Sequence, residues 1–307
     1  MVGIQEVASY IPEKRISNYS RKEKFGITDE FIKDKIGVES VSVKDDSEET
    51  SDLCVKAFYN LQEKVSINKD EIEVVVVVTQ NPDYMLPHTS AIVHGKLDLP
   101  EDCATFDVSL GCSGFVYGLS IIESFMKCNN MTKGILITAD PYSKIVDPTD
   151  KNTTLLFGDA ASAVLISDTP IYTTEAYTFG TIGKLHKDLI CENNTLYMNG
   201  RAVSSFARKT VPSAILKLLK SKDVAINDID QYLFHQGSRK MIVWMAKRLG
   251  IDSTKYMYDI HNYGNTVSSS IPILLEKQIL ITKNKLLLAS GFGVGLSWAN
   301  VIFKRVS

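Results

Sequence analysis

The sequence predicts an α/β protein made of two similar halves. Two observations lead to this prediction: short apolar runs alternate with helical patterns, and blocks of the first half recur in the second. Runs rich in Val, Ile and Leu between turn residues are typical of strands buried on both faces, and their alternation with helices indicates a layered architecture. The helical patterns cover residues 88–98, 113–127, 205–221 and 237–249.

Three blocks of sequence recur in the order in which they first occur. The matched pairs are residues 66–81 with 225–237, residues 103–114 with 255–266, and residues 134–139 with 285–290. Such internal similarity indicates duplication of one α/β unit. We therefore expect two halves, 1–168 and 169–307. Because no linker rich in Pro, Gly or Ser separates them, we expect a shared interface, with helices between two sheets and loops of both halves converging on one site.

Composition and charge narrow the functional classes. The chain has 307 residues, 44% hydrophobic and 23% charged, which is ordinary for a globular protein with a large core. A net charge of -2 gives no overall attraction to nucleic acid or to an anionic membrane. The longest apolar run, Val74–Val78, is far shorter than the roughly 20 residues of a membrane span. The N-terminus lacks the pattern of a signal peptide, so we expect a cytoplasmic protein.

The cysteines and histidines form no recognisable disulfide or metal pattern. The five cysteines are irregularly spaced without a C-x-x-C pair, and the five histidines show no H-E-x-x-H arrangement. This argues against a disulfide framework and a structural zinc site. We expect no metal.

Cys112 stands out from the other cysteines through its neighbours. The segment 106–115 places it between a strand and an apolar helix, and Gly111, Ser113 and Gly114 allow a tight turn and close approach of a substrate. At a helix N-terminus the dipole would lower the pKa of the thiol and favour a nucleophilic thiolate. The alternative interpretation is a small core residue.

His235 and Asn265 are the second-half residues of interest. His235 directly follows a buried strand, and Asn265 lies at a junction between a strand and a helix. Alone, they would be interpreted as a hydrogen-bonded loop residue and a helix N-cap. The internal repeat changes this, because Cys112 and Asn265 occupy near-equivalent points of the two halves and should meet in the same central region.

With these residues in view, the chain resembles the β-ketoacyl-acyl-carrier-protein synthase III group of the thiolase superfamily over nearly its whole length. The matching motifs, in chain order, are Gly3-Ile4 with Tyr10-Ile11-Pro12, residues 107–114 around the cysteine, residues 156–163, His235-Gln236, Gly264-Asn265-Thr266 and residues 291–298. The resemblance implies a five-layered α-β-α-β-α thiolase-like fold. It also implies a role in fatty acid biosynthesis.

The resemblance implies a two-step condensation that starts from an acyl thioester. Cys112 would accept the acyl group, and the backbone N–H groups of Cys112 and Val294 would form the oxyanion hole. His235 and Asn265 would then bind the carbonyl of a malonyl thioester on the acyl carrier protein (ACP), stabilising the enolate that forms when carbon dioxide leaves. The product would be a 3-oxoacyl-ACP, and no cofactor would be required.

The chain departs from the family at the site for coenzyme A (CoA). Many members hold the nucleotide with a tryptophan and two arginines, and the corresponding positions here are Phe31, Lys35 and Lys151. Phenylalanine still offers a stacking face, but lysine cannot make the bidentate contacts of arginine. We therefore expect a weakened CoA site and an ACP-bound first substrate. The histidine motif also differs: Gly237-Ser238 replaces Ala-Asn, so we expect altered loop support.

Further expectations concern partners and the acyl pocket. A basic set on one predicted helix is interpreted as a docking patch for the acidic ACP or, alternatively, as a solvated helix face; it comprises Arg239, Lys240, Lys247 and Arg248. Phe157 is expected in the acyl pocket, and Leu86 sits where family members insert a residue into the pocket of the partner subunit. The resemblance implies a homodimer.

Three alternatives remain. A non-condensing acyltransferase on the same fold would pass the acyl group to an amine or alcohol, but it would not need Asn265 for enolate stabilisation. A hydroxymethylglutaryl-type synthase should carry a carboxylate base, which the sequence does not place. A catalytically silent subunit of a heterodimer usually loses its nucleophile, whereas Cys112, His235 and Asn265 are all present.

Overall fold

Apolar, β-branched runs form the strands of one large mixed sheet. In the computed structural model, which describes residues 2–306, this sheet has nine strands in the order β11-β12-β13-β8-β1-β7-β6-β4-β5. Their bounds are β1 Gly3–Tyr10, β4 Val74–Val78, β5 Ala104–Val108, β6 Lys133–Ala139, β7 Ala161–Ser167, β8 Tyr172–Thr181, β11 Gln231–Phe234, β12 Leu286–Gly293 and β13 Ser297–Arg305. Two small antiparallel pairs lie outside it: β2 (Arg15–Ser17) with β3 (Ser40–Ser42), and β9 (Leu189–Glu192) with β10 (Thr195–Met198).

The strand order repeats in the two halves of this sheet. In the first half, β1 is antiparallel to β7, β7 is antiparallel to β6, and β6, β4 and β5 are parallel. In the second half, β8, β13 and β12 show the same antiparallel order, and β11 is parallel to β12. The halves meet where Ile4 of β1 pairs with Tyr172 of β8. The duplication inferred from the sequence is thus present in the fold; the boundary between 1–168 and 169–307, which falls between β7 and β8, stays a prediction.

The counterpart of β5 in the second half is not a strand. Residues 255–260 make only an isolated bridge, Tyr232 with Tyr256, at the position where β5 pairs with β4. The side chain of Gln236 replaces the missing ladder: it donates to Met257 O at 3.2 Å and accepts from Asp259 N–H at 3.0 Å. The expectation of a strand before Asn265 was therefore wrong.

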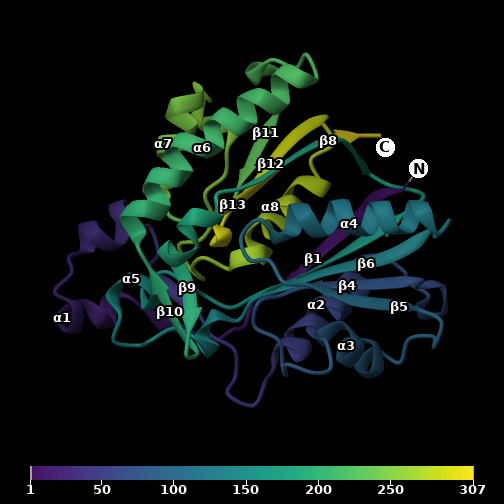
Figure 1. The fold of residues 1–307 in the computed structure, drawn as a ribbon, viewed down its shortest axis with the longest axis horizontal. Coiled ribbons are helices and arrows are strands. Elements are labelled where there is room, and N and C mark those ends of the chain that lie inside the picture. The colour runs from purple at the N-terminus through teal and green to yellow at the C-terminus, as the bar shows by residue number, and fades with distance from the viewer. Residues whose placement is uncertain (1, 307) are drawn as a thin grey trace.

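Helices form three layers around and between the two halves of the sheet (Figure 1). Their bounds are α1 Lys22–Phe25, α2 Thr50–Lys64, α3 Thr89–Leu97, α4 Gly114–Cys128, α5 Lys151–Thr154, α6 Gly200–Ser221, α7 Arg239–Leu249 and α8 Ser270–Ile279. Helices α2 and α3 cover the outer face of the first half, and α6 covers that of the second with α7 packed beside it. Helices α4 and α8 lie between the halves and contact both. This is the expected five-layered arrangement.

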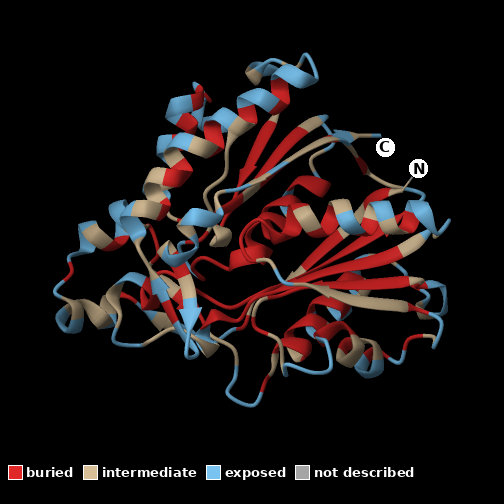
Figure 2. Cartoon of the chain, in the orientation of Figure 1, coloured by how far each residue is buried: buried red, intermediate tan, exposed pale blue. Residues whose placement is uncertain are grey.

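Burial follows the layers (Figure 2). Strand β4 is buried along its whole length, and α8 buries eight of its ten residues because both of its sides meet a sheet. Helix α4 buries seven of its fifteen residues, most of them in its N-terminal half. Helix α7 buries one face, with Ile242, Met245, Ala246 and Leu249, and exposes the other. The middle layer therefore gives a rigid platform on which loops from both halves are presented.

Candidate active site

The three residues singled out in the sequence line one cavity of about 1040 Å³. Cys112 comes from the turn between β5 and α4, His235 follows β11, and Asn265 precedes α8. Asn265 is also tied to the first half by an isolated bridge to Phe157. The duplicated topology therefore brings the three residues to one site.

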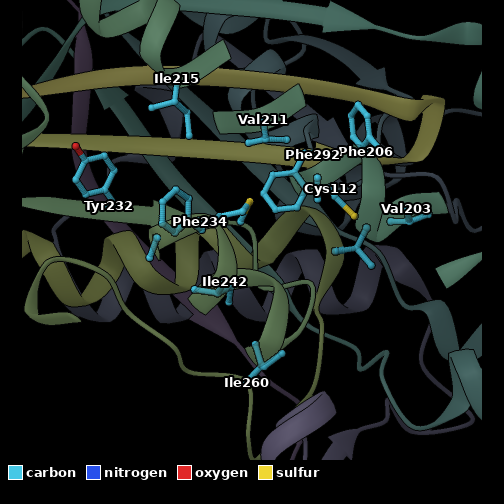
Figure 3. Packing of buried hydrophobic residues seen from close by; sticks show 14 of the residues in the cluster. Cys112, Val203, Phe206, Val211, Ile215, Tyr232, Phe234, Ile242, Ile260 and Phe292 are labelled. Atoms are coloured by element: carbon cyan, nitrogen blue, oxygen red, sulfur yellow. The ribbon is translucent and has the colours of Figure 1, made fainter. Parts of the chain in front are cut away.

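Cys112 lies at the inner end of this cavity, against Phe292 in Figure 3. Its side chain is 4% exposed, and the backbone N–H groups of Cys112 and Val294 donate to its sulfur. Gly293 permits this approach, because a Cβ there would lie 2.7 Å from the Cys112 sulfur. Two backbone donors therefore converge beside the reacting atom, and their role as an oxyanion hole for the substrate stays a prediction.

The expected lowering of the thiol pKa is wrong. Burial raises the pKa of Cys112 to about 12, and the nearby carboxylate of Asp140 raises it further, while the two backbone donors only partly oppose this. The cost of removing water from the thiolate is larger than any stabilisation of its charge by the helix N-terminus. The resting thiol is therefore protonated, and its proton must leave when an acyl thioester is attacked.

A chain of hydroxyl groups fixes the Val294 turn against α4. Ser113 at the start of α4 lies 2.8 Å from Ser297 (hydroxyl oxygens), and the Ser297 hydroxyl donates to Val294 O at 2.7 Å. Ser113 is 1% exposed and Ser297 is 3% exposed, so water does not compete for these bonds. Sequence reasoning missed both serines, because either residue alone reads as a small turn residue.

His235 is buried and neutral. Burial lowers its pKa to about 3. Nδ1 lies 2.8 Å from the Ser270 hydroxyl oxygen, which is itself 3.0 Å from Val267 O. Because the Val267 carbonyl can only accept, it takes the Ser270 proton, and the Ser270 oxygen then accepts from Nδ1–H. A proton on Nε2 requires the Ser270 hydroxyl to turn from Val267 O to Nδ1. The edge of the ring also meets Phe292.

Asn265 presents its amide nitrogen to the cavity. Its Oδ1 accepts the backbone N–H of Val267 at 2.9 Å, and because that partner can only donate, the Nδ2 group is the end left for a ligand. Val267 adopts a φ of 52°, an unusual conformation for a β-branched residue. Asn265 is therefore a positioned donor and not the helix N-cap considered from sequence.

Behind these donors lies a buried carboxylate that sequence reasoning missed. Asp140, at the end of β6, accepts from Gln80 N–H at 2.7 Å and from the Ser268 hydroxyl at 2.5 Å. Burial raises its pKa to about 6. The carboxylate joins the loop after β4 to the loop after Asn265. Asp140 is not one of the described residues that line the cavity.

The three residues expected to contact CoA meet at the mouth of the cavity. The ammonium groups of Lys35 and Lys151 lie 4.8 Å and 5.0 Å from the centre of the Phe31 ring. Ammonium groups already lie over this ring, so a stacked adenine would compete with them.

The opposite wall of the mouth comes from α6 and α7. Arg201 and Arg208, seven residues apart on one face of α6, line the cavity with Trp244 of α7, and Arg208 lies over the Trp244 ring at 5.2 Å. Sequence reasoning missed these residues, although the seven-residue spacing on a helix was a usable signal. Of the described residues that line this cavity, none is Asp or Glu.

The predicted docking residues separate into two sets. Arg239, Lys240 and Lys247 line a groove of about 670 Å³ that adjoins the mouth, between α7 and residues 28–35. Arg248 is exposed but lines neither this groove nor the main cavity. Phe157 lines the main cavity as expected, whereas Leu86 is 86% exposed and does not reach the cavity of its own chain.

Comparisons with known proteins identify the family of this chain. Residues 106–183 match the family described as 3-oxoacyl-[acyl-carrier-protein (ACP)] synthase III, and residues 219–305 match its C-terminal part. A β-ketoacyl-[acyl-carrier-protein] synthase III of Lactococcus lactis subsp. cremoris is 33% identical, with 97% of this chain and 98% of the relative covered. The chain belongs to the 3-oxoacyl-ACP synthase III family.

Relatives from other organisms show the same agreement. The synthase III of Streptococcus mutans is 33% identical over 98% of each chain. The solved synthase III of Thermus thermophilus has 28% identity and a TM-score of 0.92 over 99% of each chain. The fold is thiolase-like.

Within residues 2–306, no helix combines the length and the apolar character needed to cross a membrane. In the same residues, no cluster of three or more His, Cys, Asp and Glu side chains is arranged to hold a metal ion. All five cysteines are free.

Proposed function

We propose that the protein is a decarboxylating 3-oxoacyl-ACP synthase III, which condenses an acyl thioester with malonyl-ACP. One observation carries this proposal: a cysteine with two backbone donors at its sulfur shares a cavity with a neutral histidine and an asparagine amide. The printed names of the relatives support the same reaction.

In the first half-reaction, the sulfur of Cys112 attacks the carbonyl carbon of an acyl thioester. The carbonyl oxygen becomes negative and is stabilised by the N–H groups of Cys112 and Val294. The tetrahedral intermediate collapses by breaking the original C–S bond, and the carrier thiol leaves with the proton that Cys112 gives up. An acyl-enzyme remains.

In the second half-reaction, the carbonyl oxygen of malonyl-ACP binds Nδ2–H of Asn265 and Nε2–H of His235, the tautomer that forms when the Ser270 hydroxyl turns to Nδ1. Carbon dioxide leaves, and its bonding electrons form an enolate whose oxygen these two donors stabilise. The enolate carbon then attacks the acyl carbonyl on Cys112, and the adduct collapses by breaking the C–S bond to give 3-oxoacyl-ACP. The Cys112 thiolate that leaves takes up one proton from solvent, which restores the resting thiol. Every group in these steps belongs to the chain or to the substrates, so the proposed reaction needs no metal and no organic cofactor.

The mouth supports a substrate that arrives on a negatively charged, phosphorylated arm. Five cations line the cavity, and its described lining residues contain no carboxylate; the cations are Lys35, Lys151, Arg201, Arg208 and Lys240. Because Lys35 and Lys151 lie over Phe31, we propose that the first acyl group arrives on ACP and that the CoA site is weak. Equal rates of Cys112 acylation from an acyl-CoA and the same acyl-ACP would contradict this.

Helix α7 offers a matched test of ACP docking. We propose that Lys240 and Lys247 bind acidic residues of ACP, because both line the groove beside the mouth. Lys240→Glu should raise the KM for malonyl-ACP at least about tenfold, which corresponds to roughly 1.4 kcal/mol. Arg248→Glu makes the same charge change on the same helix outside the groove and should have a much smaller effect. Equal effects would argue for nonspecific charge attraction.

The decisive experiment joins intact-mass analysis with measurement of carbon dioxide. Acyl thioesters should add one acyl group to the wild-type protein and none to Cys112→Ala. Malonyl-ACP should then release carbon dioxide and yield 3-oxoacyl-ACP. Acylation without carbon dioxide release would favour the non-condensing acyltransferase, and absence of acylation would contradict the proposal.

We also propose a cytoplasmic homodimer.

A further inference from the structure

The backbone and the side chain of Asn265 are held by different parts of the fold. Its backbone N–H donates to Leu156 O at 2.8 Å, and its carbonyl oxygen accepts from Gly158 N–H at 3.0 Å. The first half of the chain therefore holds the backbone of Asn265 directly. The orientation of the carboxamide is set separately, by the hydrogen bond from Val267 N–H to Oδ1.

The turn that supplies this N–H is strained. Val267 begins the turn Val267–Ser269 and has a φ of 52°, in the left-handed region that a β-branched residue rarely adopts. Such a conformation is costly and persists only where surrounding contacts impose it. If those contacts were lost, Val267 would relax toward an ordinary conformation, and its N–H would turn away from Asn265.

Contacts that hold this turn come from the end of β6. The Ser269 hydroxyl donates to Thr138 O at 3.0 Å and lies 2.9 Å from the Thr138 hydroxyl oxygen. The Ser268 hydroxyl donates to Asp140 Oδ2 at 2.5 Å, and the backbone N–H of Ser268 also interacts with this carboxylate. Asp140 is 0% exposed, so water does not compete for these bonds.

The contact with Asp140 is the stronger of the two. Burial raises the pKa of Asp140 to about 6, so most of this group is ionised at neutral pH. Its other oxygen, Oδ1, accepts from Gln80 N–H at 2.7 Å. Hydrogen bonds to an ionised group are roughly twice as strong as bonds between neutral groups, and a buried carboxylate depends on them. Asp140 therefore fixes Ser268 more firmly than Thr138 fixes Ser269.

We propose that Asp140 is a positioning residue for the condensation step: by holding Ser268 it fixes the turn Val267–Ser269, and this turn fixes the amide of Asn265. The inference rests on the proposed function, because that amide is the group assigned to the enolate oxygen. Asp140 is not among the described residues that line the cavity, so it acts through Asn265 and does not touch the substrate.

The test compares two rates in each variant: acylation of Cys112, measured by intact mass, and release of carbon dioxide from malonyl-ACP by protein that is already acylated. In Asp140→Asn, the Nδ2 group must replace one carboxylate oxygen, and it then faces a backbone N–H that can only donate. The turnover of condensation should fall at least about tenfold, but by less than the 10²–10³ expected for loss of the donor itself. The KM for malonyl-ACP should change little, because the donor matters most once the enolate charge develops.

Acylation should respond differently from condensation. Burial and then the charge of Asp140 raise the pKa of Cys112, so a neutral residue at position 140 should leave acylation as fast as in the wild type or faster. A merely structural role would predict the opposite, because damage to the fold of the site slows both half-reactions.

Two further variants separate positioning from stability. Ser268→Ala removes the same bond from the other side, should slow condensation and not acylation, and replaces Asp140→Asn if that protein does not fold. The double variant should be little slower than Asp140→Asn alone. Asp159→Asn is the matched control: Asp159 is also 0% exposed, but its carboxylate accepts from the backbone N–H groups of Lys44 and Ser143, so the ratio of the two rates should keep its wild-type value.

Equal losses of both rates in Asp140→Asn and Ser268→Ala, or unchanged condensation in both, would overturn the inference. A wild-type protein that is not acylated, or that releases no carbon dioxide, would instead overturn the proposed function.

Discussion

At the scale of single residues, the site works by fixing which atom of each side chain faces the substrate. Val267 N–H donates to the oxygen of Asn265, and Nδ1 of His235 is hydrogen-bonded to the Ser270 hydroxyl oxygen. Each side chain is thereby left with a nitrogen for the cavity. Both side chains are uncharged at neutral pH. They therefore do not form an ion pair with the malonyl carboxylate, and they can stabilise the enolate oxygen as its charge develops.

Asn265→Asp should separate the two half-reactions. The aspartate keeps an oxygen for Val267 N–H but loses the Nδ2 donor, so condensation should fall by about 10²–10³ while acylation of Cys112 changes little. Product formation and acyl-enzyme mass report the two steps independently. Asn130→Asp makes the same change at an exposed residue outside the cavity lining and should leave both steps nearly intact. A parallel loss of acylation in Asn265→Asp would contradict the assigned role.

His235 should make the folded protein sensitive to mild acid. Its pKa is about 3 in the folded state and about 6.5 in the unfolded state. Between these two values the unfolded chain binds a proton at this histidine and the folded chain does not, so acid favours the unfolded state. The free energy of unfolding should therefore fall by about 2 kcal/mol from this group between pH 7 and pH 5. Urea unfolding of wild type and His235→Gln at both pH values measures the difference. If both proteins lose the same free energy, the histidine is not held neutral by burial.

At the scale of elements, the turn after β12 depends on α4 for its position. The bond between Ser113 and Ser297 joins the helix of the nucleophile to the turn of Val294, whose N–H we propose as the second oxyanion donor. Ser297→Ala should slow Cys112 acylation about tenfold, the equivalent of one buried hydrogen bond of roughly 1.4 kcal/mol.

A double-mutant cycle identifies the cause of this effect. Ser113→Ala removes the same bond from the other side, so the double variant should be little slower than Ser297→Ala alone. Independent, additive losses would mean that the two serines act separately.

Elements were predictable from sequence where one local pattern decided them. The valines of β4 and the amphipathic pattern of α7 place those elements within two residues. The segment 255–260 was not predictable, because its backbone partners are atoms of the Gln236 side chain. The site follows the same division between local patterns and distant contacts. Cys112, His235 and Asn265 were proposed from their local turns and from the family resemblance. Ser270, Ser297 and Asp140 could not be proposed, because their roles depend on contacts between residues far apart in the sequence. The pKa of Cys112 was misjudged because burial cannot be read from a helix position alone.

At the scale of the whole molecule, one surface segment exposes more apolar side chain than is usual for a monomer. Tyr84, Met85 and Leu86 are consecutive apolar residues with exposures of 62%, 97% and 86%. They lie between β4 and α3, close to the edge strand β5, whose residues are all half-buried and whose outer backbone edge is unpaired within residues 2–306. An exposed sheet edge next to an exposed apolar loop is typical of an interface, because both features favour association.

We therefore expect the protein to have about twice the 34.1 kDa mass of one chain in light scattering coupled to size-exclusion chromatography. Leu86→Asp should shift the mass toward the monomer, because a carboxylate would be desolvated in an apolar interface. Leu280→Asp changes a leucine that is 84% exposed at the end of α8 and should leave the mass unchanged. If Leu86 also enters the acyl pocket of a second copy, Leu86→Asp should slow Cys112 acylation at protein concentrations where the dimer persists. A dimer that tolerates Leu86→Asp with unchanged acylation would place the interface elsewhere.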